Sequence, residues 1–151
     1  MKRRRLTAGF TLVEMLVATA ILVVLTSMAI PLARISIERE KEHLLRVDLR
    51  EMRNAIDRYK DAADRGLIQV QTDTHGYPPD LQTLVDGVQM GTEKIRFLRK
   101  IPEDPFTDSY TWGLRSVQDA PDSTSWGGQD VFDVYTTSQA TALDGTQVDQ
   151  W

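Results

Sequence analysis

The sequence predicts an α+β protein in which one long N-terminal helix packs on a small C-terminal antiparallel sheet. Two observations support this fold class. A long apolar run is followed by a charged segment whose apolar residues recur every three or four positions, as on one face of a helix. Near the C-terminus, two short segments alternate between apolar and polar residues, as strands do, and a loop rich in Asp, Pro, Ser and Gly separates them.

The apolar run covers residues 10–33, FTLVEMLVATAILVVLTSMAIPLA, and contains one charged residue, Glu14. As a helix it spans roughly 36 Å, enough to cross the hydrocarbon core of a bilayer. Its apolar residues occupy every face, which excludes an amphipathic surface helix. A core helix of a soluble protein and a cleavable secretory signal ending near residues 27–29 are alternatives. The length of the run counts against both, and the carboxylate near its start counts against the signal.

The orientation of this helix in a membrane does not follow from charge alone. Four basic residues lie in the first five positions, and further basic residues follow the run closely. Long segments are translocated largely regardless of their charge. We therefore expect the N-terminus on the cytoplasmic side and the part after the helix exported.

Glu14 needs an explanation, because a carboxylate within a membrane helix is costly unless it lies near an interface or is paired. One interpretation places it at headgroup level beside the helix N-terminus, where the helix dipole favours an anion. The other interpretation is that Glu14 pairs with a cation. Cleavage before Phe10 creates a new amino terminus one helical turn away, or within reach of the Glu14 of a neighbouring copy.

The segment Gly9–Glu14, GFTLVE, behind a basic leader and at the head of an apolar helix, resembles the class III signal of type IV pilins and type II secretion pseudopilins. The resemblance implies cleavage after Gly9 by a prepilin peptidase, N-methylation of Phe10, and pairing of Glu14 with the N-terminus of an adjacent subunit during filament assembly. Pro31 stands where these proteins often carry a helix-loosening proline. Because proline removes a backbone hydrogen bond, it predicts a kink or local melting.

The charged segment over residues 34–65 predicts an amphipathic stalk helix. Its apolar positions are spaced by three or four, namely Leu45, Leu49, Met52, Ile56, Tyr59 and Ala63. A coiled coil is the rival interpretation, but the stripe covers fewer than three heptads. Gly66 is a candidate stop for the helix. We expect the downstream residues to cover the stripe, because they are the remaining candidate within the chain.

The part over residues 66–151 predicts a globular head. Asp80 is a candidate N-cap for a short helix over residues 81–85, and strands are expected at 110–114 and 131–135. The Gly-Tyr-Pro motif before Leu81, the run FLRKIPEDP over residues 97–105 and the terminal Trp151 resemble the major pseudopilin of type II secretion. The sequence has no cysteine, so it has neither a disulfide framework nor a thiolate metal site.

Calcium is the one cofactor to consider, because the resemblance implies a calcium site in the C-terminal loop. Here the sequence departs from the family pattern, since residues 136–139, TTSQ, replace the Gly-x-Asp-Gly that follows the second strand. Asp133, Asp144 and Asp149 remain as acidic residues, and Asp144 and Asp149 are the calcium candidates. The alternative, which we favour, is that Asp144 and Gly145 form a turn.

The expected function is structural. The resemblance implies a pseudopilus subunit with a leader over residues 1–9, a single-pass anchor in the bacterial inner membrane and a periplasmic head. Expected partners are copies of itself, minor pseudopilins, the prepilin peptidase and the inner-membrane assembly platform. The alternatives are a type IV pilus subunit and a tethered binding domain that never polymerises. No enzyme motif occurs, and the acidic balance, 22 acidic to 18 basic residues, argues against nucleic-acid binding.

Overall fold

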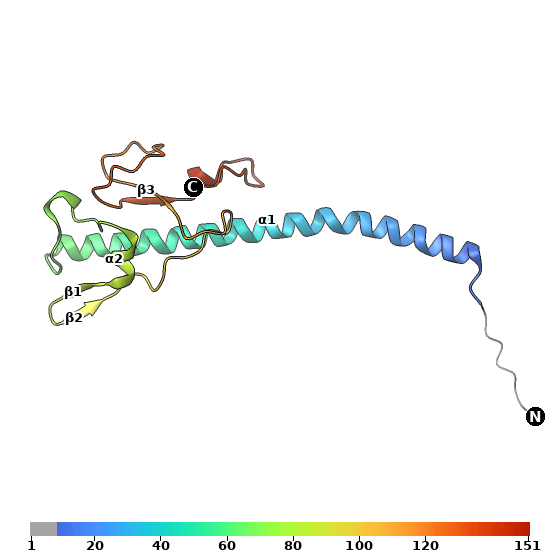
Figure 1. The fold of residues 1–151 in the computed structure, drawn as a ribbon, viewed down its shortest axis with the longest axis horizontal. Coiled ribbons are helices and arrows are strands. Elements are labelled where there is room, and N and C mark those ends of the chain that lie inside the picture. The colour runs from blue at the N-terminus through green and yellow to red at the C-terminus, as the bar shows by residue number, and fades with distance from the viewer. Residues whose placement is uncertain (1–8) are drawn as a thin grey trace, which may run out of the picture. The chain divides into compact units, whose positions relative to one another are not determined.

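The computed structural model describes residues 9–151, with the side chains of residues 28–33 left out. The chain divides into two compact units, Met1–Ile37 and Glu38–Trp151 (Figure 1). One helix, α1 (Leu12–Asp64), supplies the backbone of the first unit and continues into the second. The predicted leader, residues 1–9, lies outside the described residues except for Gly9.

α1 ends just before Gly66, the residue predicted to stop this helix. The amide of Gly66 donates to the carbonyl of Ala63 at 2.9 Å, and the amide of Leu67 donates to the carbonyl of Ala62 at 3.0 Å. This pair of bonds is the Schellman motif, which satisfies the last carbonyls of a helix. Gly66 has a φ of 68°, a left-handed conformation that glycine adopts without steric cost. The helix therefore stops where a residue without a side chain permits the reversal.

The core of the second unit is built on the apolar stripe of α1. Leu45, Leu49, Met52, Ile56 and Tyr59 are at most 3% exposed. The residues that cover this stripe come from across the head and are likewise buried, namely Ile68, Leu81, Leu84, Phe97, Leu98, Trp112, Val131, Val134, Ala142 and Val148. The stripe is thus covered by the chain's own downstream residues, which confirms the expected packing and the α+β class.

The short helix α2 (Leu81–Asp86) begins at the predicted N-cap. The carboxylate of Asp80 accepts a hydrogen bond from the amide of Thr83 at 2.7 Å. This bond satisfies one of the amides that lack a partner in the first turn of a helix. Leu81 and Leu84 are the buried side chains of α2, so the cap fixes the point at which this helix enters the core.

The sheet expected in the head is present as two separate antiparallel ladders. β3 (Gly113–Arg115) pairs with β4 (Asp133–Tyr135), with Leu114 opposite Val134. Both are shorter than the predicted strands 110–114 and 131–135. The first is shortened because the indole of Trp112 donates to the carbonyl of Pro102 and the amide of Thr111 donates to the Ser109 hydroxyl. Residues 110–112 therefore lie outside the strand, and Ser109 forms an isolated bridge with Asp104.

A second hairpin, which the sequence analysis did not anticipate, consists of β1 (Val88–Met90) and β2 (Glu93–Ile95). Its two-residue loop begins at Gly91, whose φ is 61°. Two short 3₁₀ turns, Thr72–Thr74 and Val148–Gln150, complete the described elements.

Two expectations concern the first unit. Within the described part of the chain, no helix is both long enough and apolar enough to cross a membrane. The predicted span over residues 10–33 includes residues 28–33, whose side chains lie outside the description. α1 continues through Pro31 without interruption, so the predicted local melting is not observed there, and the kink stays a prediction.

Candidate assembly site

The first turn of α1 is organised by Thr11. Its hydroxyl accepts a hydrogen bond from the amide of Glu14 at 3.2 Å, and its carbonyl accepts one from the amide of Met15 at 3.1 Å. A threonine followed three residues later by a glutamate is the spacing of a capping box, in which the hydroxyl satisfies a free amide of the first turn. The sequence analysis missed this role of Thr11, although the spacing alone signals it.

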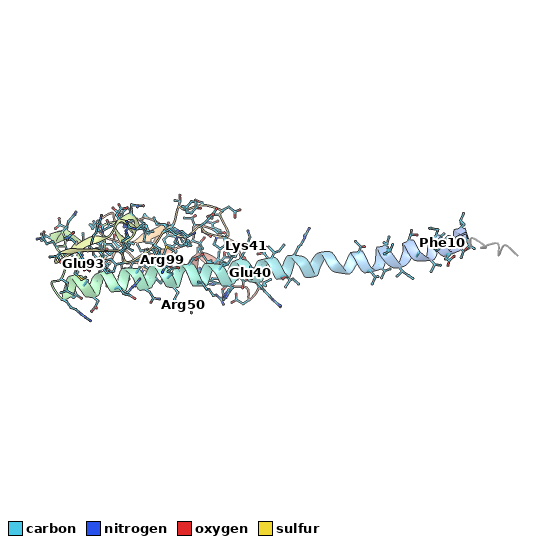
Figure 2. The ribbon with its side chains drawn as sticks, turned by 90° about the horizontal axis from the view of Figure 1, so that it is seen from below. Phe10, Glu40, Lys41, Arg50, Glu93 and Arg99 are labelled. Atoms are coloured by element: carbon cyan, nitrogen blue, oxygen red, sulfur yellow. The ribbon has the colours of Figure 1, made fainter. Side chains whose placement is uncertain are left out.

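The proposed processing residues lie just before this cap. Gly9 and Phe10 are exposed, and the Phe10 side chain is 74% exposed at the start of the helix (Figure 2). A side chain added at Gly9 meets nothing within 4 Å in this chain. A larger side chain would therefore fit at position 9 of this chain. The Gly9–Phe10 peptide bond lies between two exposed residues.

Glu14 occupies the third position of the helix and is exposed. Its carboxylate lies in the first turn, where the helix dipole stabilises a negative charge by about 0.3–1 kcal/mol at an exposed site. Among the described residues no cation lies within 4.0 Å of it. The helix terminus therefore stabilises the charge of Glu14, while a direct partner is not supplied by the described part of the chain.

Large apolar side chains are exposed on all sides of α1 after this first turn. Eleven of them in residues 10–25 are between 49% and 81% exposed, namely Phe10, Leu12, Val13, Met15, Leu16, Val17, Ile21, Leu22, Val23, Val24 and Leu25. Contiguous apolar surface of this extent normally marks a face that contacts lipid or protein. The described residues of the first unit do not bury it, so its cover comes from outside this unit.

The few polar side chains on this surface are satisfied within the helix. The hydroxyl of Thr19 donates to the carbonyls of Met15 and Leu16, that of Thr26 to Leu22 at 2.7 Å, and that of Ser27 to Val24 at 2.8 Å. A hydroxyl paired in this way needs no water. The helix surface after Glu14 can therefore enter an apolar environment without leaving a hydroxyl unpaired.

The two calcium candidates belong to no group of three or more potential metal ligands among the described residues. Asp144 lies in a turn, where its carboxylate accepts from the amide and the hydroxyl of Thr146 at 2.9 and 2.7 Å. These bonds, the hydroxyl first, lower the pKa of Asp144 below its ordinary value. Gly145 has a φ of 88°, as the favoured turn interpretation requires.

Asp149 lies elsewhere, in the last 3₁₀ turn, and the third acid, Asp133, pairs with Arg53 at 2.7 Å. No group of three or more potential metal ligands occurs among the described residues. Because calcium takes six to eight oxygen ligands, the acids present do not fit a calcium site of the implied kind.

The exposed apolar segment of α1 carries one charge, Glu14, in its first turn, and an α+β head follows it. The resemblance to pilin-like proteins implies this arrangement. Residues 4–30 match the prokaryotic N-terminal methylation motif. The chain is also similar to type II secretion system core protein G of Pseudomonas aeruginosa, with 27% identity over 118 residues that cover 73% of this chain and 75% of that protein. No solved structure matches. The chain is therefore pseudopilin-like.

Proposed function

We propose that this protein is a structural pseudopilus subunit of a type II secretion system. In this proposal the helix over residues 10–33 first anchors the chain in the bacterial inner membrane, with the head in the periplasm. A prepilin peptidase cuts after Gly9, and Phe10 is N-methylated. The assembly platform then incorporates the subunit, together with minor pseudopilins, into a periplasmic filament that aids the export of folded proteins.

The exposed apolar surface of residues 10–25 is the observation that carries this proposal. Burying a large apolar side chain is worth about 1.5–3 kcal/mol, so eleven exposed ones require an apolar cover. Lipid supplies this cover before assembly, and the same helix of neighbouring copies supplies it afterwards. The internally paired hydroxyls of Thr19 and Thr26 suit both environments, because neither environment offers water.

The position of Glu14 supports the same proposal. The cap by Thr11 holds Glu14 in the first turn, directly after the junction of Gly9 and Phe10. Cleavage at that junction generates a cation on Phe10, and the described residues offer Glu14 no other cation within 4.0 Å. In the filament, Glu14 of one copy then pairs with the amino terminus of its neighbour, which offsets the cost of an unpaired carboxylate among apolar helices.

Replacing Glu14 by alanine tests the polymerisation step. We expect Glu14→Ala to remain in the membrane fraction but to form no filaments, whereas Glu38→Ala, an exposed acid on the same helix, assembles normally. Normal filaments from Glu14→Ala would refute an assembly role for Glu14, and absence of filaments from the unsubstituted chain would favour a tethered domain that never polymerises. Two assays separate the pseudopilus from a type IV pilus. Loss of exoprotein secretion without the subunit indicates a pseudopilus, whereas loss of filaments from the cell surface indicates a type IV pilus.

Mass spectrometry of the mature chain tests the processing steps. The expected N-terminus is Phe10 carrying one added methyl group. A mature chain that begins at any other residue contradicts the proposed processing, whatever the filament assay gives.

A further inference from the structure

Six exposed basic side chains form a surface on α1 and on the segment over residues 94–100. We call it the basic surface, and it consists of Arg50 and Arg58 on α1 and Lys94, Arg96, Arg99 and Lys100 in and after β2. Among the described residues, no carboxylate lies within 4.0 Å of any of these six groups. In Figure 2, Arg99 is labelled on the head side of α1 and Arg50 at the other edge of this helix. Positive charge is therefore in excess here, although Glu51 lines the same surface and Asp48 lies near Lys100.

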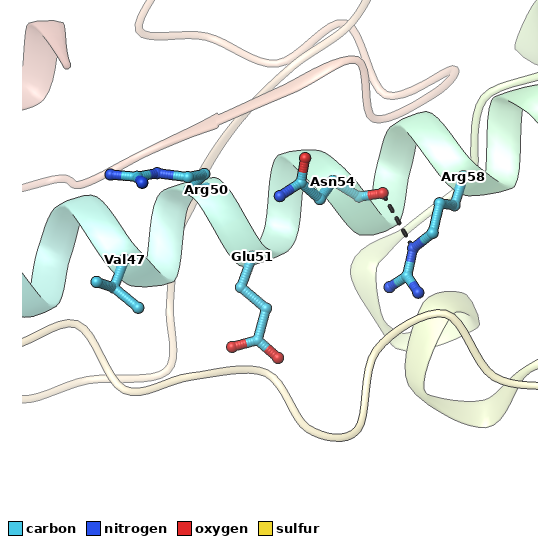
Figure 3. Close-up of a pocket in the computed structure, with 5 residues that line it drawn as sticks. All are labelled: Val47, Arg50, Glu51, Asn54 and Arg58. Atoms are coloured by element: carbon cyan, nitrogen blue, oxygen red, sulfur yellow. Dashed lines mark hydrogen bonds between the residues drawn. The ribbon is translucent and has the colours of Figure 1, made fainter.

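The basic surface contains a groove. One hollow of about 490 Å³ is lined by Val47, Arg50, Glu51, Asn54 and Arg58, and these side chains lie along successive turns of α1 (Figure 3). A second hollow, lined by residues 96–99, shares Glu51 and Arg58 with the first. Arg58 also donates to the carbonyl of Phe97 at 2.5 Å, which ties the two walls together. The first hollow thus lies along α1, and the second, which continues it, lies between α1 and the segment after β2.

Negative charge is gathered in the opposite part of the sequence. From residue 116 to residue 151 the chain contains six aspartates and neither lysine nor arginine. Three of the six have cationic partners within the head: Asp130 lies beside His75, Asp133 pairs with Arg53, and Asp144 pairs with Arg46. The other three have no cation within 4.0 Å among the described residues, and we call them the acidic surface: Asp119, Asp122 and Asp149.

The acidic surface also contains a hollow, of about 300 Å³, with Asp122 and Asp149 in its lining. Arg115 lines it too, but its guanidinium is engaged with Asp133 at 3.5 Å and with the ring of Tyr135 at 4.0 Å. One carboxylate oxygen of Asp149 is buried and has no hydrogen-bond partner in this chain. An unpaired buried acceptor costs about 1–3 kcal/mol, so a positive charge brought to this hollow would stabilise the carboxylate.

The two surfaces are not paired within one copy. The β1–β2 hairpin and the segment that follows it lie on one side of α1, and β3 with the loop after it lies on the other (Figure 1). Among the described residues, no group of the basic surface lies within 4.0 Å of a group of the acidic surface. Two complementary surfaces at different places on a subunit make a heterologous contact, which repeats into an open helical array when the rotation does not close.

We propose that the basic surface of one copy docks on the acidic surface of the next copy. The inference rests on the proposed filament function and adds a specific head-to-head contact to it. The groove beside Arg58 receives the loop that carries Asp122, and an arginine of the basic surface reaches the hollow at Asp149. Opposite charges on the two faces fix which neighbour binds where, because like charges brought together are repelled.

Cross-linking in the full-length chain tests the contact, since the natural chain has no cysteine. Asn54→Cys places a thiol in the basic groove, and Thr124→Cys places one beside the acidic hollow. With a short bismaleimide, a chain carrying both substitutions is expected to give a ladder of oligomers. Chains with one substitution give none, and a mixture of the two single variants gives a dimer.

Charge reversal then tests the cause of the contact. Arg99→Asp or Asp122→Arg in the double-cysteine chain is expected to weaken the ladder about tenfold, and combining the two reversals is expected to restore it. Arg65→Glu, an exposed arginine outside both surfaces, serves as the control and leaves the ladder unchanged. A ladder that no reversal alters, or one that the combined reversal fails to restore, overturns the proposal.

Two comparisons separate this inference from its alternatives. A Val17→Cys chain reports helix packing alone. If it cross-links while the Asn54/Thr124 pair does not, the head contact is wrong and the filament function stands. If neither cross-links, the filament function itself fails. Loss of binding to vesicles of anionic phospholipid in Arg99→Asp, with an unchanged head ladder, would instead identify the basic surface as a lipid contact and overturn the proposal.

Discussion

Arg53 joins β4 and Trp151 to one position on α1. Its guanidinium donates to both carboxylate oxygens of Asp133, at 2.7 and 3.4 Å, to the carbonyl of Val134 at 3.1 Å and to the carbonyl of Trp151 at 2.7 Å. Replacing Arg53 by alanine removes every one of these bonds. Asp133 keeps a contact with Arg115 at 3.5 Å, whereas the two carbonyls lose this donor.

The expected loss of stability is about 2 kcal/mol. Hydrogen bonds to charged groups contribute about 1.5–3 kcal/mol each when buried, and exposed ion pairs contribute about 0–1 kcal/mol. The side chains of Arg53 and Asp133 are 37% and 25% exposed, so water screens the pair and hydrates part of what is lost. For a folded unit of this size, about 2 kcal/mol corresponds to a decrease in Tm of roughly 8 °C.

Thermal unfolding of the full chain in detergent, followed by tryptophan fluorescence, measures this change. The three tryptophans, Trp112, Trp126 and Trp151, all lie in the head, so the signal reports on that unit alone. Arg50→Ala is the matched control on the same helix and is expected to leave Tm within about 1 °C. A Tm for Arg53→Ala equal to that of Arg50→Ala would refute the reasoning, and so would full stability of Arg53→Lys, because lysine cannot reproduce the forked geometry.

Three further substitutions probe the head by the same fluorescence assay. Burial, with the charges of Glu51 and Asp104, raises the pKa of Asp48. The folded chain then binds this proton more tightly than the unfolded chain, so stability falls as pH rises from 3.8 through the folded pKa. Asp48→Asn is expected to raise Tm at pH 7 and to have no such effect below pH 3.8. Gly113→Ala places a methyl group 2.3 Å from a ring atom of Tyr135 and is expected to cost about 1–3 kcal/mol, seen as a lower urea midpoint. Asp80→Ala removes the cap of α2 and is expected to cost about 1 kcal/mol, whereas Asp80→Asn is nearly neutral.

The parts of the fold that sequence analysis predicted depend on neighbours within a few residues. The stripe from Leu45 to Tyr59 follows the period of a helix, and the core is built on it. The cap at Asp80 and the stop at Gly66 are likewise local, because each is determined by one residue and the amides or carbonyls next to it.

The β1–β2 hairpin lacked such a signal. Its strands are three residues long, neither contains a fully buried side chain, and the loop begins with Gly91 and Thr92 instead of the favoured Asn-Gly. The predicted strands over residues 110–114 and 131–135 were too long at their first residues. The start of the first depends on bonds of residues 109–112 to each other and to Pro102, and before the second the amide of Val131 donates to the carbonyl of Pro78; alternation of apolar residues reveals neither.

Several contacts that hold the head together join residues far apart in the chain. Arg53 and Trp151 are 98 positions apart, and Arg58 and Phe97 are 39 apart. No local pattern indicates such pairs. The start of α1 is the opposite case, because residues 9–14 are contiguous. Their resemblance to the pilin signal was enough to predict roles for Gly9, Phe10 and Glu14. Whether these residues are processed and pair as proposed is a matter for the experiments above.

The apolar core of the head begins at Leu45, and none of its residues comes from the exposed apolar stretch of residues 10–25. The folding free energy of the head is therefore generated entirely downstream of that stretch. A change in what surrounds residues 10–25, from lipid to protein, leaves every buried contact of the head in place. In the assembly proposed above, the subunit would thus exchange one apolar environment for another without unfolding, and the filament would display the head that formed before assembly.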